Sequence, residues 1–265
     1  MQDLKYGQLT VFIAESNSAL GKAGAADFAA AVAAALETRD EVAVILATGN
    51  SQLSFMDALC DRTDIEWSRI TILHMDQYLG MAEDHPESFS RYMQEKLVTR
   101  VKPKAFYGVR GDHEPVEEEL ARYGQLVRDL DPIICVMGIG ENGHLAFNDP
   151  PADFDTREMI HIVELDEACR AQQVGEGHFA TVADVPTRAL TLTVHALMRP
   201  ASVIVLTPEA RKAQVVKRAL EGPVTPDCPA SLLQTAANAR LYLDADSSAL
   251  LDRRDESSDG SRVIV

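Results

Sequence analysis

A histidine, two asparagines and two carboxylates follow closely on one another in the glycine-containing stretch "GIGENGHLAFNDPP", residues 138–151. Its reactive members are Glu141, Asn142, His144 and Asp149. The charge of a histidine changes near neutral pH, and a neighbouring carboxylate can orient its ring and raise its pKa for proton transfer. The opening letters G-x-G-x-x-G suggest a dinucleotide loop, but the third glycine should then open a helix, and the nearby proline pair leaves no room for one. The stretch therefore predicts an acid–base loop.

Asp76 is a second candidate base, in "ITILHMDQYLG". A carboxylate just past an apolar strand is placed at the mouth of a sheet, where desolvation can prepare it to accept a proton. The alternative is that Asp76 only caps the next segment, and His74 is expected to pack along the strand. A metal site from His74, Asp76, Glu141 and His144 is conceivable, but no motif such as H-E-x-x-H supports it.

A third group of polar residues follows the apolar run in "LATGNSQLSFMDAL". Thr48, Gly49, Asn50 and Ser51 stand between this expected strand and an expected helix. Free backbone N–H groups, a glycine and hydroxyls at such a turn suit a phosphate or another anion. An ordinary strand-to-helix connection with Ser51 as the N-cap explains the same letters. The spacing of a Walker A loop is absent.

The elements that must position these residues alternate between short β-branched runs and longer segments of helical spacing. This alternation predicts an α/β fold: a modified doubly wound, Rossmann-like, mainly parallel sheet flanked by helices in a single domain. Strands are expected at residues 9–16, 42–48, 69–75, 105–109, 133–140, 159–165, 189–194, 202–207 and 239–244. Helices are expected at residues 18–39, 51–61, 87–101, 114–130 and 208–222. The domain should cover residues 1–245, and residues 246–265 should form a polar, partly disordered tail.

Composition excludes several classes of function. The 265 residues carry 41 acidic and 25 basic side chains, a formal net charge of −16, which disfavours nucleic acid and anionic membranes as partners. The longest apolar stretches are far shorter than the roughly 20 residues that cross a bilayer, and the N-terminus lacks a secretory pattern, so we expect a cytoplasmic protein that does not span a membrane. The 4 cysteines have no C-x-x-C spacing, and we expect reduced thiols.

Four separated motifs together resemble the glucosamine-6-phosphate deaminase/isomerase family, part of the 6-phosphogluconolactonase superfamily. The resemblance covers roughly residues 10–245. The related lactonases share the Gly-His pair but continue as "DGHTASLFP", whereas this chain reads "NGHLAFNDP", which favours the deaminase branch. The motifs are "LATGNS", "HMDQYLG", "HPESFSRYM" and "GIGENGHLAFNDP".

The resemblance implies a reaction and its residues. It implies conversion of a phosphorylated amino sugar to a ketose phosphate and ammonia, without a metal or redox cofactor, by an enzyme that is either monomeric or a homo-oligomer. Asp76 would move a proton from C2 to C1, and His144, supported by Asp149, would assist opening of the sugar ring. The phosphate would be held by Lys212 together with the turn formed by residues 48–51. Without the resemblance, Lys212 would be interpreted as a surface lysine.

The chain departs from the family pattern at three places. Asn142, preceded by Glu141, stands where many members carry Asp before the Gly-His pair, and Asp149 replaces a longer Glu. The phosphate-binding arginine of the family falls near Glu176, so that Arg170 or Arg188 would have to substitute. Gln172 and Gln173 instead offer neutral donors and acceptors. Met159 and His161 replace the basic residues of allosterically regulated members, and we expect no activation by N-acetylglucosamine 6-phosphate.

Two other functions fit the same resemblance. A non-catalytic sugar-phosphate sensor would share the fold, but it would leave Asp76 and His144 without a role, and no helix-turn-helix segment or basic face is apparent. A 6-phosphogluconolactonase-like hydrolase is the second alternative, from the sister family.

Overall fold

The central element of the fold is a sheet in the order β1-β2-β11-β10-β7-β3-β4-β6. The computed structural model describes residues 3–252. All neighbouring strands in this sheet run parallel except β1 and β2, which form an antiparallel pair at one edge. The strands are β1 (Asp3–Tyr6), β2 (Leu9–Ile13), β3 (Val42–Leu46), β4 (Ile70–His74), β6 (Ala105–Tyr107), β7 (Ile134–Met137), β10 (Ser202–Thr207) and β11 (Ala239–Leu243). The predicted doubly wound α/β architecture is confirmed.

Both faces of this sheet are buried, each in its own hydrophobic core. Successive side chains of a strand point to opposite faces. Thus Ile45 belongs to one core, while its neighbours Val44 and Leu46 belong to the other. The same division separates Val205 from Ile204 in β10. Burial on both faces explains why these strands read as unbroken apolar runs.

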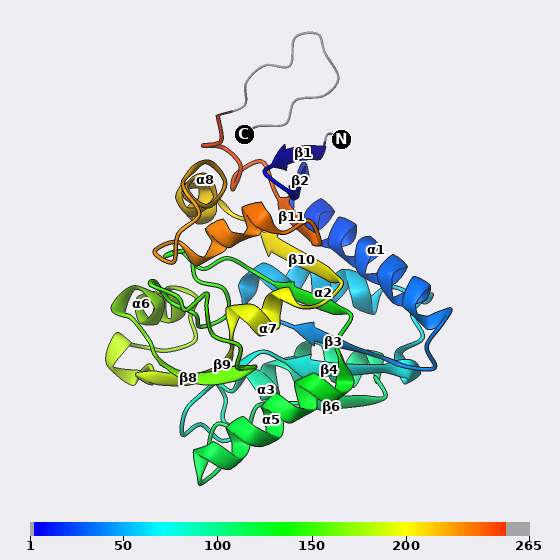
Figure 1. Cartoon of the computed structure of the whole chain (residues 1–265), viewed down its shortest axis with the longest axis vertical. Helices are drawn as coiled ribbons and strands as arrows, with labels where there is room; N and C mark the ends of the chain where they lie inside the picture. The colour runs from blue at the N-terminus through cyan, green and yellow to red at the C-terminus, as the bar shows by residue number, and fades with distance from the viewer. Residues whose placement is uncertain (1–2, 253–265) are drawn as a thin grey trace.

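Helices cover the two faces and the sheet ends (Figure 1). The core that contains Val44 also contains α1 and α2, whereas α5, α7 and α8 contribute to the core that contains Ile45. The α-helices are α1 (Asn17–Leu36), α2 (Leu53–Cys60), α3 (Phe89–Met93), α4 (Thr99–Val101), α5 (Val116–Leu130), α6 (Glu167–Gly175), α7 (Val194–Met198) and α8 (Ala213–Glu221). One π-turn, Gln94–Val98, joins α3 to α4. Short 3-10 turns lie at Asn50–Gln52, Trp67–Arg69, Val182–Asp184, Ala210–Lys212 and Pro229–Thr235.

Three strands form a second sheet that the sequence pattern did not separate from the first. β5 (Asp76–Tyr78), β9 (Arg188–Leu192) and β8 (Ile160–Glu164) pair antiparallel in the order β5-β9-β8. Periodicity predicted strands near β8 and β9 correctly, but it does not report which strands pair. In Figure 1 this sheet lies with α6 at one side of the molecule, away from α1.

Two expectations about the ends of the chain are corrected by the structure: one concerns the longest apolar stretch, and the other concerns the polar tail. α1 is long and apolar enough to cross a membrane by length and composition, a test that buried core helices also pass. Here Leu20 and Phe28 on α1 are fully buried in the core. The expected polar tail is packed at its start, because Ser247 is buried and Leu251 joins the core. Its remainder, residues 253–265, lies outside the described residues.

We predict that Gly21→Ala destabilises the fold, because Gly21 allows α1 to approach α2. A Cβ at this position would lie 2.5 Å from the carbonyl carbon of Ser54, too close for a real contact. Overpacking of this kind costs about 2 kcal/mol. The control is Gly124→Ala in α5, where the nearest atom would lie 3.6 Å away and where alanine favours the helix. Urea unfolding should show a loss of stability for Gly21→Ala alone; equal midpoints for the two variants would contradict the prediction.

Candidate active site

A single pocket collects the carboxyl ends of four neighbouring strands, β10, β7, β3 and β4. Ligands of open α/β sheets bind at this edge, near the place where the strand order reverses. Each strand contributes the residues that follow it. The lining consists of Ala47, Thr48, Gly49, Ser51, Met75, Asp76, Phe89, Gly138, Ile139, Gly140, His144, Ala146, Phe147, Gln172, Gln173, Glu176, His178 and Lys212.

Asp76 lies at the corner where the chain leaves the parallel sheet. β4 ends at His74, and Asp76 begins β5, opposite Thr191 of β9. Tyr123 of α5 fixes this corner, since its hydroxyl accepts a hydrogen bond from the backbone N–H of His74 at 3.0 Å. Only 6% of Asp76 is exposed, and burial raises the pKa of its carboxyl to about 7. The carboxyl group is therefore set to gain and lose a proton near neutral pH.

An uncharged histidine lies beside this carboxyl group. His74 Nε2 lies 3.6 Å from Asp76 Oδ1, but burial lowers the pKa of His74 to about 3. Both ring nitrogens of His74 lack a hydrogen-bond partner among the described residues, and the ring packs edge-on against Phe89. The prediction that His74 packs along the strand is confirmed. Because this imidazole is neutral, it does not hold Asp76 in the ionised form.

His144 and Asp149 form a hydrogen-bonded pair on the loop that follows β7. His144 Nδ1 lies 2.9 Å from Asp149 Oδ1, while the ring lines the pocket. Gly140 makes room for this ring, because a Cβ there would lie 2.2 Å from His144 Nε2. The backbone N–H of Gly140 also donates to the carbonyl oxygen of His144 at 3.0 Å. The glycines of this loop therefore serve the histidine rather than a dinucleotide.

Asn142 and Asp166 hold Asp149 in position behind the histidine. The Asn142 amide donates to Asp149 Oδ1 at 2.9 Å and to Asp166 Oδ2 at 3.0 Å, and the Asp166 N–H donates to Asp149 Oδ2 at 3.1 Å. Burial alone would raise the pKa of Asp149, but the His144 ring and the Asn142 amide outweigh it and lower the pKa. Asp149 is thus a carboxylate that can support a positive charge on His144.

The turn after β3 and Lys212 form another part of the pocket. Thr48, Gly49 and Ser51 line it, and the positive φ of 96° at Gly49 shapes the turn. Lys212, in the 3-10 turn that precedes α8, is only 3% exposed. Burial lowers the pKa of Lys212 to about 8, so its ammonium is charged at neutral pH and accessible from the pocket.

Five predicted site residues are absent from the pocket lining: Asn142 and Asp149 lie behind His144, and Arg170, Glu141 and Asn50 make other contacts. Arg170 donates to the carbonyl oxygens of Val182 and Val185 at 2.5 and 3.1 Å, so the expectation that it binds the substrate is corrected. Its guanidinium secures the segment after α6 instead. The exposed Glu141 pairs with Arg211 at 2.9 Å. Asn50 donates its amide to the carbonyl oxygen of Glu176 at 3.4 Å and lies outside the lining.

For several lining residues, the sequence did not predict a role in the pocket. Phe89 and Phe147 form an apolar wall with ring centroids 5.7 Å apart, and both occur in the family motifs without a stated role. His178, on the segment after α6, is joined to the site only by folding. The family resemblance aligned Glu176 with a phosphate-binding arginine, and the structure places Glu176 in the pocket lining.

One group of side chains has the composition of a metal site. In the described part of the chain, ligand atoms of His144, Asp149 and Cys169 lie within 4.8 Å of one another. Both oxygens of Asp149 already accept hydrogen bonds, and burial raises the pKa of the Cys169 thiol well above its ordinary value. A neutral thiol is a poor ligand, and the arrangement fits a hydrogen-bond network better than a metal site.

The fold and pocket define a class: a doubly wound α/β protein with two proton-transfer groups at the carboxyl edge of its sheet. A carboxyl group that titrates near pH 7 and a histidine backed by a carboxylate are the components of general acid–base catalysis.

Comparison with known proteins places the chain within this class. The profile of the family described as glucosamine-6-phosphate isomerases/6-phosphogluconolactonase matches residues 15–242, and the chain belongs to this family. The glucosamine-6-phosphate deaminase of Exiguobacterium sibiricum is 37% identical over 207 residues, which are 78% of this chain and 80% of that protein. The enzyme of the same name from Streptococcus pneumoniae is 33% identical over 208 residues, 78% of this chain and 86% of the relative.

Solved structures agree with the sequence comparison. A monomeric glucosamine-6-phosphate deaminase superposes with a TM-score of 0.82 at 27% identity, over 91% of this chain and 99% of the other. A 6-phosphogluconolactonase from Thermotoga maritima superposes with a TM-score of 0.72 at 18% identity, over 89% and 99% of the two chains, and shares the fold. The resemblance inferred from the four sequence motifs is confirmed.

We predict that Asp76→Asn changes the pH dependence of stability. The folded pKa of Asp76, about 7, lies above its ordinary value of 3.8, so the wild type loses stability as pH rises between these values, by at most roughly 4 kcal/mol. Asparagine has no charge to bury. The stability difference in favour of Asp76→Asn should therefore grow from pH 4 to pH 7 and then level off in urea unfolding. Parallel stability curves for the two proteins would show that the carboxyl is not perturbed.

Proposed function

We propose that the protein is an amino-sugar deaminase and aldose–ketose isomerase of the glucosamine-6-phosphate deaminase type. The observation that carries the proposal is that one pocket is lined by Asp76, a carboxyl group whose pKa burial raises to about 7, and by His144, which is hydrogen-bonded to Asp149. The names of its relatives and the four motifs support the same reaction. The acidic, cysteine-poor chain is consistent with a cytoplasmic metabolic enzyme.

In the proposed mechanism, Asp76 moves one proton between adjacent carbons. His144 first assists ring opening by proton transfer at the ring oxygen, with Asp149 stabilising its positive charge. Ionised Asp76 then takes the proton from C2 and returns it to C1, which converts the 2-amino aldose to a 2-imino compound. Water hydrolyses the imine to a ketose and ammonia. A single carboxylate suits both proton transfers, because its pKa near 7 lets it accept and release a proton with little free-energy cost.

We predict that Asp76→Asn abolishes most of the turnover. Loss of a general base typically costs about 10² to 10⁴ in rate, and asparagine keeps the size of the side chain. The measurement is ammonia release, with glucosamine and glucosamine 6-phosphate supplied in separate assays. For the wild type, kcat/KM should rise with pH toward a plateau above about 7, since only the ionised carboxyl accepts the proton. Equal turnover by Asp76→Asn and wild type on either sugar would refute the proposed role.

We predict a smaller effect for Asp149→Asn. This change keeps the hydrogen-bonding shape but removes the charge that supports protonated His144, and kcat should fall by roughly tenfold to a hundredfold with little change in KM. The exposed Asp61, changed to Asn, is the control and should leave turnover unaltered. A change in KM alone would assign Asp149 to substrate binding instead.

A further inference from the structure

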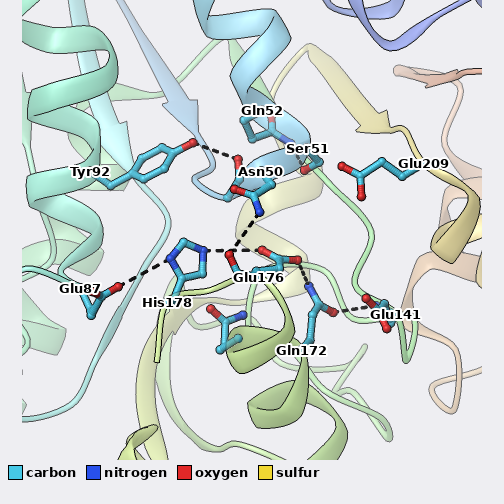
Figure 2. A network of polar contacts seen from close by, with 12 residues as sticks. Asn50, Ser51, Gln52, Glu87, Tyr92, Glu141, Gln172, Glu176, His178 and Glu209 are labelled. Carbon is cyan, nitrogen blue, oxygen red and sulfur yellow. Dashed lines mark hydrogen bonds and ion pairs between the residues drawn. The ribbon is translucent and has the colours of Figure 1, made fainter. Parts of the chain in front are cut away.

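A buried carboxylate, Glu176, lies in the pocket beside the turn that was expected to hold a phosphate. A Cβ on Gly49 would be 3.8 Å from Glu176 Oε2, and only 7% of the Glu176 side chain is exposed. Its backbone carbonyl oxygen accepts the amide hydrogen bond of Asn50 at 3.4 Å, which ties the end of α6 to this turn (Figure 2). The protein thus places its own negative charge next to the turn.

The surrounding side chains keep Glu176 ionised. Burial alone would raise its pKa, but His178, Arg211, Gln172 and Lys212 together lower it to about 2. Gln172 donates to Oε1 at 2.8 Å and Arg211 lies 3.0 Å from the same oxygen. Figure 2 shows His178 between Glu87 and Glu176. The two ring nitrogens lie 3.7 Å from the two carboxylates, Nδ1 from Glu87 and Nε2 from Glu176. Glu176 is therefore a fixed anion.

One of the two cations near this turn, Arg211, is already paired with carboxylates. Arg211 pairs with Glu176, with Glu141 at 2.9 Å and with Glu209 at 2.6 Å, and its side chain does not line the pocket. Among the lining residues of the described chain, Lys212 is the one lysine or arginine. Its ammonium makes no hydrogen bond to any described residue, which leaves it able to donate to a ligand. A phosphate dianion here would meet one free cation and a fixed carboxylate, an arrangement in which repulsion opposes binding.

We propose that the substrate presents an uncharged hydroxyl group to this turn, so that the enzyme acts on free amino hexoses in preference to their 6-phosphates. The hydroxyl would donate to Glu176 and accept from Lys212, while the amides of Gln172 and Gln173 are within the same lining for neighbouring hydroxyls. A carboxylate that accepts a hydroxyl hydrogen bond selects against a ligand without that hydrogen, because both partners are then acceptors. This inference rests on the proposed deaminase function and specifies its substrate.

The reaction balances with one water as co-reactant. A 2-amino-2-deoxyhexose isomerises to the 2-imino compound, and one water then adds at C2 while the C–N bond breaks, giving a ketohexose and ammonia. The group at C6 takes no part in any bond that forms or breaks. The exchange of phosphate for hydroxyl therefore alters binding but leaves the roles of Asp76 and His144 unchanged.

The test compares kcat/KM for glucosamine and glucosamine 6-phosphate, measured by ammonia release, in wild type, Glu176→Gln and Glu176→Arg. Wild type should favour glucosamine by at least about tenfold. Glu176→Gln keeps the size of the side chain and should reduce the preference, and Glu176→Arg should reverse it, because a guanidinium binds phosphate and repels no anion. A wild type that prefers the phosphate, with no further gain in Glu176→Gln, would overturn the inference.

A binding measurement separates this inference from the proposed reaction. Inorganic phosphate should raise the melting temperature of Glu176→Arg but not that of wild type or Glu176→Gln at equal ionic strength. If phosphate also raised the melting temperature of the wild type, Glu176 would not prevent anion binding, and the inference would be wrong. If no protein releases ammonia from either sugar while phosphate still stabilises only Glu176→Arg, the deaminase function is wrong and the exclusion of anions stands.

Discussion

The burial of Asp76, which pairs with no lysine or arginine in residues 3–252, is the constraint on which the site depends. A buried carboxyl group loses the solvation of its charged form, and its pKa rises to about 7. Had a lysine or arginine lain beside it, the pKa would have fallen and the group would be a poor proton carrier between two carbons. The adjacent His74 is held neutral by the same burial, which keeps its pKa near 3. Burial of the ionised carboxylate is unfavourable for folding, but it keeps the pKa of this reactive group near 7.

The position of this carboxyl follows from the transition between two sheets. β4 stops at His74, and the chain turns into β5 within two residues, so that Asp76 stands at the edge of the parallel sheet while its backbone pairs with β9. The hydroxyl of Tyr123 occupies the end of β4 and satisfies the N–H that the missing strand partner leaves open.

The remaining charges of the pocket divide it into two regions. In one, Asp149 supports His144 and the amide of Asn142 fixes both. The amide at position 142 orients the carboxylate without adding a second negative charge beside it. In the other, Glu176 and Lys212 face the turn after β3, with Arg211 committed to surrounding carboxylates. The proposed mechanism assigns proton transfer to the first region, and the proposed substrate preference rests on the second.

The amino-acid sequence by itself determined the α/β class, most of the strands, and the three strand ends that carry Asp76, His144 and the turn at Gly49. These features are local: apolar runs set strands, and glycines and prolines set the loops between them. Only the tertiary structure decided that β8 and β9 form a separate sheet, that Arg170 serves the backbone near Val185, and that Glu176 pairs with Arg211. Each of these depends on contacts between residues distant in the chain. The raised pKa of Asp76 also depends on the tertiary structure, because the burial that causes it comes from the packed fold and not from the residues next to Asp76 in the sequence.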